Sequence, residues 1–134
     1  GIVFLEHALA QQLKPHQEEG CRFMMKHLMA GGGCILADSM GLGKSLQALC
    51  VLWAALNRPA GRPLSRKAAV VCPSSLCGNW ESEVTKWLGP IRLRPTVVQG
   101  GSSAQATIRA VTSFLAAGGV AASDGRLLII SYDQ

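Results

Sequence analysis

The chain has 134 residues, of which 49% are hydrophobic and 16% charged, and its formal net charge is +5 at pH 7. This composition indicates one globular domain with a single core and excludes an intrinsically disordered chain. The longest unbroken apolar run, 48–56, is too short for a membrane-spanning helix, which needs about 20 residues. The basic balance, with a pI of about 9.2, mildly favours a polyanionic partner.

Both ends of the chain look cut, because it opens with Gly1 instead of Met and stops just after a strong strand signal. We therefore expect a piece of a larger protein. The five cysteines have irregular spacing, which predicts neither a disulfide framework nor a zinc site and favours a reducing compartment. They are Cys21, Cys34, Cys50, Cys72 and Cys77. The three histidines also lack metal-ligand spacing, so no metal is assigned to them.

The first predicted helix begins at Pro15, because proline suits the first helical position. Glu18 and Arg22 on this helix have the spacing of an i,i+4 ion pair. Its apolar face is predicted to consist of Cys21, Met24, Met25, Leu28 and Met29. Three glycines at 31–33 then end the helix, and the short apolar run 34–37 predicts a strand.

A second helix is predicted from Lys44 to about Asn57, and because it is apolar nearly all round we expect it to be buried. A loop follows at 58–67, and it contains four basic residues. They are Arg58, Arg62, Arg66 and Lys67. A solvated loop is the preferred interpretation of this cluster, ahead of a nucleic-acid surface.

Strands then alternate with helices to the end of the chain. The predicted strands are 68–72, 96–99 and 127–130, and the predicted helices are 76–88 and 104–117. This alternation indicates an α/β fold with a parallel sheet covered on both faces. Because ligands bind beyond the carboxyl ends of such strands, loops 38–44, 73–75 and 131–133 are expected at the functional edge, and 58–67 at the opposite one.

The first of these loops carries the strongest functional signal. Its residues are Asp38, Ser39, Met40, Gly41, Leu42, Gly43, Lys44 and Ser45. A glycine-bearing loop between a strand and a helix start presents backbone N–H groups to an anion, so it predicts a nucleotide-phosphate site. Lys44 supplies a positive charge, and the Ser45 hydroxyl can bind Mg²⁺. The general pattern has glycine where Asp38 stands, and a purely structural glycine turn is the alternative.

Hydrolysis requires a magnesium-binding Asp at the end of an apolar strand. Asp133 is the only candidate, and it comes too late, after Ser131 and Tyr132, so it is rejected as a metal ligand. The segment is therefore expected to bind nucleotide weakly and to hydrolyse none by itself.

Several motifs together resemble those of SWI/SNF-type ATPases in helicase superfamily two. They are the stretches 14–17 and 37–45, and Asn79 and Trp80 with Glu83 and Trp87. Within this family the chain is most similar to the eukaryotic DNA translocases of recombinational repair. That similarity rests on Cys34 and on the stretches 73–76, 83–89 and 128–132. The family usually has Glu where Ser39 stands and Thr where Ser45 stands.

The resemblance implies a three-layer RecA-like P-loop NTPase fold, with a mostly parallel sheet and only the N-terminal part of the first motor lobe. A lead-in segment would occupy 1–13, and the partial lobe 14–134. ATP and Mg²⁺ would be the cofactors. Gln17 would read the adenine, Lys44 would be the catalytic contact to the β- and γ-phosphates, and Ser45 would hold the magnesium. The residues implied to contact the DNA backbone are Pro73, Ser74, Ser75, Ser131 and Tyr132.

The implied parent is a nuclear, DNA-dependent ATPase that moves along double-stranded DNA in homologous recombination and repair. Its implied partners are DNA and the strand-exchange recombinase, with no membrane. Two alternatives stay open, namely a chromatin-remodelling ATPase of the same family and a nucleotide-sensing module that does not hydrolyse.

Overall fold

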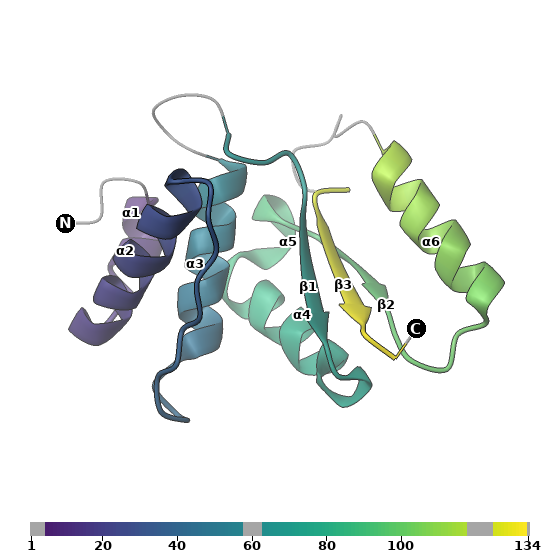
Figure 1. Cartoon of the computed structure of the whole chain (residues 1–134), viewed down its shortest axis with the longest axis horizontal. Helices are drawn as coiled ribbons and strands as arrows, with labels where there is room; N and C mark the ends of the chain where they lie inside the picture. Colours follow the sequence, from purple (N-terminus) through teal and green to yellow (C-terminus); the bar gives the residue numbers. More distant parts are fainter. Residues whose placement is uncertain (1–4, 58–62, 118–124, 134) are drawn as a thin grey trace. The chain divides into compact units, whose positions relative to one another are not determined.

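The computed structural model of the chain describes residues 5–57, 63–117 and 125–133. The chain divides into two compact units, Gly1–Ser65 and Arg66–Gln134. The described part of the first unit is helical, and the second contains a sheet with helices (Figure 1).

The first unit consists of α1 (His7–Ala10), α2 (Pro15–Met29) and α3 (Lys44–Leu56). Helices α2 and α3 pack against each other. Helix α3 buries seven of its thirteen residues, which confirms the expectation of a buried helix. It can be buried because the apolar side chains of this helix are not confined to one stripe.

Helix α2 has the predicted bounds, but only part of its predicted apolar face is buried. Cys21 and Met25 are buried, whereas Leu28 and Met29 are 42% and 52% exposed. The apolar spacing therefore continues for a turn beyond the buried contact. The predicted ion pair is present, with Arg22 Nη2 and Glu18 Oε1 2.6 Å apart on the surface.

The strand predicted at 34–37 is wrong. This segment is not part of a ladder with any described residue, and Ile35 is 84% exposed. A strand requires a neighbour whose backbone N–H and C=O groups it can bind, and four apolar residues cannot specify that neighbour.

The second unit alternates strands and helices as predicted. Its elements are β1 (Ala68–Cys72), η1 (Ser74–Leu76), α4 (Cys77–Trp87), α5 (Gly89–Arg92), β2 (Pro95–Val98), α6 (Ala104–Ala116) and β3 (Leu127–Ser131). The three predicted strands and the two predicted helices are confirmed within one residue at each end. Helices α1 and α5 were not predicted, because four residues are too few to show a helical period.

The sheet is parallel, with strand order β1-β3-β2, which confirms the predicted α/β fold class. Its register places Cys72 of β1 opposite Ser131 of β3. The two strands therefore end side by side, and the chain segments that follow them start from the same edge.

Two helices cover opposite faces of this sheet. The chain passes from β1 across to β2 through α4 and returns to β3 through α6, so right-handed crossovers place the two helices on opposite sides (Figure 1). Phe114 of α6 packs with Val98 and Leu128 on one face. Leu127 and Ile129, fully buried, alternate with Leu128 and so belong to the other face.

Four of the five cysteines are buried and free, and reduced cysteines at such positions behave as small apolar side chains. Cys34 is the exposed one. The Sγ atoms of Cys72 and Cys77 lie 3.6 Å apart, and burial raises the pKa of Cys72 to about 11. The Cys72 side chain is therefore a neutral thiol at physiological pH.

The basic loop is only partly described, since Arg58 and Arg62 lie outside the described residues. Arg66 is exposed. The Lys67 ammonium lies 4.6 Å from the centre of the Phe114 ring and donates to the Phe114 carbonyl. Lys67 thus has an internal role in the second unit, joining the start of β1 to α6.

Candidate functional site

The loop 38–43 leads directly into α3, and two glycines shape it. Gly41 and Gly43 have φ angles of 83° and 77°, in the left-handed region that favours glycine. Gly43 is the residue just before Lys44, where the helix begins. The sequence therefore has glycine at two positions where the backbone reverses, which is the reason the loop forms at this place.

The start of α3 offers backbone donors to an anion. No side chain caps this end of the thirteen-residue helix. The first N–H groups of a helix have no intrahelical partner, and the helix dipole adds a positive potential there. A phosphate group would meet both needs, so the local geometry fits the triphosphate that the sequence predicts.

Lys44 contributes the positive charge of the loop. Its Nζ donates a hydrogen bond of 2.7 Å to the carbonyl oxygen of Asp38, and the side chain is half-buried. The ammonium group is thus held at the first residue of the loop. Ser45, the proposed magnesium contact, is also half-buried, whereas Ser39 and Met40 are exposed.

Helix α2 braces the loop through the Leu42 carbonyl. Gln17 Nε2 donates to this oxygen at 3.3 Å, and Gln17 Oε1 accepts from the Lys14 backbone N–H at 2.9 Å. His16 Nε2 also lies 2.9 Å from the Leu42 oxygen and donates to it in the tautomer that carries a proton there. Gln17 is buried, so these contacts fix the first turn of α2 against the loop.

The close approach of α2 is a second reason why residue 43 is glycine. A Cβ atom at this position would lie 2.1 Å from Gln17 Nε2, so a side chain would collide with the brace. The contact of His16 was not predicted from the sequence. Its position beside Gln17 in the first helical turn was the one available signal.

A second residue that sequence reasoning missed is Gln47 of α3. It is completely buried, and its Nε2 lies 3.5 Å from the Gly43 carbonyl. Its Oε1 has no hydrogen-bond partner among the described residues, and it faces Gly20 of α2, where an added Cβ would lie 1.8 Å away. Gly20 thus allows α2 to pack closely on α3 just behind the loop.

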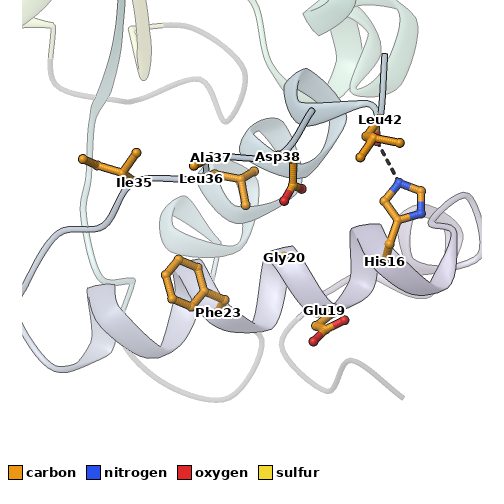
Figure 2. Close-up of a pocket in the computed structure, with 9 residues that line it drawn as sticks. All are labelled: His16, Glu19, Gly20, Phe23, Ile35, Leu36, Ala37, Asp38 and Leu42. Atoms are coloured by element: carbon orange, nitrogen blue, oxygen red, sulfur yellow. Dashed lines mark hydrogen bonds between the residues drawn. The ribbon is translucent and has the colours of Figure 1, made fainter. Parts of the chain in front are cut away.

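A cavity of about 420 Å³ lies beside the loop, between α2 and residues 35–38 (Figure 2). Figure 2 shows the His16 ring directed at Leu42 along the rim. Glu19 and Asp38 also line the cavity, and their negative charges disfavour an anion there. The phosphates are therefore expected at the start of α3 and not inside this cavity.

In the second unit, the structure brings together two of the predicted DNA-contact residues from distant parts of the chain. Ser74 Oγ and Ser131 Oγ lie 2.7 Å apart. Asp133 completes the group, because its Oδ2 lies 2.7 Å from Ser74 Oγ and 3.2 Å from Ser131 Oγ. We call Ser74, Ser131 and Asp133 the hydroxyl–carboxylate cluster.

The members of this cluster differ in exposure. Ser131 is only 2% exposed, and its Oγ also accepts a hydrogen bond from the Asp133 backbone N–H at 3.1 Å. Asp133 is exposed, and hydrogen bonds, above all from the Ser74 hydroxyl, hold the pKa of its carboxyl below the ordinary value. The carboxylate therefore stays ionised at neutral pH.

The other predicted DNA-contact residues lie on the same edge of the sheet. The Tyr132 backbone N–H donates to the Cys72 carbonyl at 3.1 Å, and the Tyr132 side chain is 63% exposed. Ser75 is exposed, and Pro73 is half-buried. Across the described ranges, no three His, Cys, Asp or Glu side chains gather as a metal site would require, and no helix has the length and apolarity of a membrane span.

Comparison with known proteins adds to this geometry. The chain is 43% identical to the DNA repair protein rhp54 of Schizosaccharomyces pombe, a match that covers 81% of this chain and 14% of that protein. It is 40% identical to the DNA repair and recombination protein RAD54-like of Gallus gallus, over 98% of this chain and 18% of that protein. The chain thus spans less than a fifth of the length of these relatives.

A solved structure is also similar, the SWI2/SNF2 ATPase core of Sulfolobus solfataricus in complex with double-stranded DNA. The TM-score is 0.62 at 26% identity, and the match covers 90% of this chain and 21% of that one. This core has a RecA-like fold, which agrees with the predicted fold class. The family model of the SNF2-related domain matches residues 16–134. With nearly its whole length matched, the chain belongs to the SNF2-related domain family.

Proposed function

We propose that this chain is the ATP-binding part of a DNA-dependent ATPase that moves along double-stranded DNA in homologous recombination and repair. The observation that carries the proposal is the start of α3, where Gly43 turns the backbone and Lys44 places its charge beside free helical donors. Membership of the SNF2-related family supports ATP hydrolysis by the parent protein. The names of the relatives support a role in repair.

Nucleotide recognition is proposed to use both the loop and its brace. Gln17 already accepts from Lys14 and donates to Leu42, yet its amide keeps one lone pair and one hydrogen for an adenine edge. Binding of the base would thereby stiffen the contact that holds the loop. Lys44 would neutralise the outer phosphates, and Ser45 would hold Mg²⁺, which supplies Lewis-acid stabilisation of phosphate charge when bound.

The DNA contact is proposed to lie at the carboxyl edge of β1 and β3. Its residues are Pro73, Ser74, Ser75, Ser131 and Tyr132. Hydroxyl groups and backbone N–H groups bind phosphate oxygens without reading the base sequence, which suits a motor that moves along any DNA. The solved relative in complex with double-stranded DNA supports this partner.

The finer features of the parent are proposals of the same kind. Residues 14–134 would form the front part of the first motor lobe after a lead-in of 1–13. The parent would act in the nucleus with the strand-exchange recombinase. The relatives named for repair favour this role over chromatin remodelling.

The test is Lys44→Ala in the intact protein that carries this chain. Loss of a charge-assisted contact to phosphate should weaken nucleotide binding about 10–100-fold. The control is Lys26→Ala, which removes the same charge from an exposed position of α2 and should leave binding unchanged. DNA-stimulated hydrolysis that survived Lys44→Ala would overturn the proposal.

A second assay separates the alternatives. The wild-type intact protein should release phosphate from ATP faster with naked double-stranded DNA, without a need for nucleosomes. Stimulation by nucleosomes alone would favour the remodeller, and no hydrolysis under any condition would favour the sensing module.

A further inference from the structure

The hydroxyl–carboxylate cluster contains a carboxylate at the place where the proposed function requires a DNA phosphate. Asp133 Oδ2 lies within hydrogen-bond distance of both serine hydroxyls, at 2.7 Å from Ser74 Oγ and 3.2 Å from Ser131 Oγ. Hydroxyl hydrogens are the donors that a phosphate oxygen would use. The same donors are thus already engaged by an anion of the chain itself.

Counting hydrogens shows why the two anions compete. Each serine hydroxyl has a single hydrogen to donate. Ser74 gives its hydrogen to Asp133, and Ser131 can give its own only to Asp133 or to Ser74. No hydroxyl hydrogen of the pair is then left for a phosphate, so binding through these groups requires Asp133 to leave.

The charge and the exposure of Asp133 support the same conclusion. Asp133 remains ionised, because the hydrogen bonds from Ser74 and Ser131 lower its pKa. A phosphate approaching Ser74 would therefore also meet a negative charge a few ångströms away, which is unfavourable. Asp133 is exposed, so it can turn into water without leaving a buried charge behind.

We propose that Asp133 is an affinity-determining residue, whose carboxylate occupies the phosphate position of the DNA contact and must be displaced when DNA binds. This inference rests on the proposed function. Competition from Asp133 weakens the contact with the DNA backbone. This property suits a motor that must release the backbone at each step.

The experiment measures the affinity of the intact protein for a short duplex DNA of mixed sequence by fluorescence anisotropy. Asp133→Asn removes the charge but keeps the shape of the side chain, and Asp133→Ala frees both hydroxyls. Both should bind DNA roughly two- to fivefold more tightly than wild type at moderate salt. The difference should shrink as salt is raised, because screening weakens the repulsion.

The control for net charge is Glu81→Gln, which removes one negative charge from an exposed position of α4. This variant should raise DNA affinity by less than Asp133→Asn does. The double variant Ser74→Ala/Asp133→Asn tests the local nature of the effect, because without the Ser74 hydroxyl the gain should be largely lost. Unchanged nucleotide affinity and a cooperative thermal unfolding transition would show that the variants are folded.

Two failures are distinguishable. If Ser74→Ala alone leaves DNA affinity unchanged, the proposed DNA contact is wrong and the inference falls with it. If Ser74→Ala weakens binding but Asp133→Asn gains no more than Glu81→Gln, or loses affinity, the DNA contact stands and Asp133 is not a competitor.

Discussion

The loop proposed to bind phosphate, which we call the phosphate loop, and the hydroxyl–carboxylate cluster are built in different ways. The loop comes from one continuous stretch, 38–45, whose glycines and helix start determine its backbone geometry locally. The cluster joins Ser74 to Ser131, 57 positions apart in the chain, and it exists only because β1 and β3 pair in one register. The loop thus forms locally and is then held by α2, whereas the assembled cluster depends on the sheet beneath it.

The two regions also differ in what already fills them. In the loop, the Lys44 ammonium contacts the Asp38 carbonyl, a neutral group that an anionic ligand can replace at small cost. In the cluster, the hydroxyls contact a full carboxylate. The loop is thus prepared to receive an anion, while the cluster already holds one.

The largest expected effect tests how far the cluster depends on its sheet. Ile129→Ala empties a fully buried position of the central strand β3 and should lower the free energy of unfolding by about 2–5 kcal/mol. Val71→Ala in β1, where the side chain is 60% exposed, is the control and should change it by about 0.5 kcal/mol or less. Urea denaturation measures both, and equal losses would contradict the burial of Ile129 in the sheet.

An intermediate effect tests the brace of the phosphate loop. Gly43→Ala and Gly41→Ala both place a side chain at a left-handed position, which costs about 1–2 kcal/mol. Only Gly43→Ala also displaces Gln17, since nothing lies within 4 Å of a Cβ atom at Gly41. Gly43→Ala should therefore reduce nucleotide affinity and melting temperature more than Gly41→Ala. Identical behaviour of the two variants would argue against the contact between Gln17 and the loop.

The smallest effect concerns the titration of Asp133. The pKa of Asp133 is lower in the folded protein than in the unfolded chain. The ionised carboxylate therefore stabilises the fold at pH values above its ordinary pKa, and this stabilisation is lost as the pH falls through the lowered pKa. Ser74→Ala removes the strongest of the hydrogen bonds and should raise the Asp133 pKa toward the ordinary value. Carboxyl chemical shifts in an NMR titration measure this, with Ser102→Ala as the control. A pKa unmoved by Ser74→Ala would contradict the cluster geometry.

Much of the local structure follows from short-range patterns. Pro15 and Lys44 begin the helices where the sequence predicts them, and the strand–helix alternation of the second unit is confirmed almost residue by residue. The strand predicted at 34–37 failed for a physical reason. A short apolar run is consistent with a buried strand, but only a partner segment makes it one.

Residue patterns alone predicted the glycine loop before α3, the parallel sheet, and hydroxyl groups at the ends of β1 and β3. These depend on backbone preferences and on side-chain periods, which act between residues close in the chain. The tertiary structure alone revealed three features. They are the Leu42 carbonyl shared by His16 and Gln17, the buried Gln47, and the carboxylate between Ser74 and Ser131. Contacts of this kind join segments far apart in the chain, and strand register and helix packing decide which atoms meet.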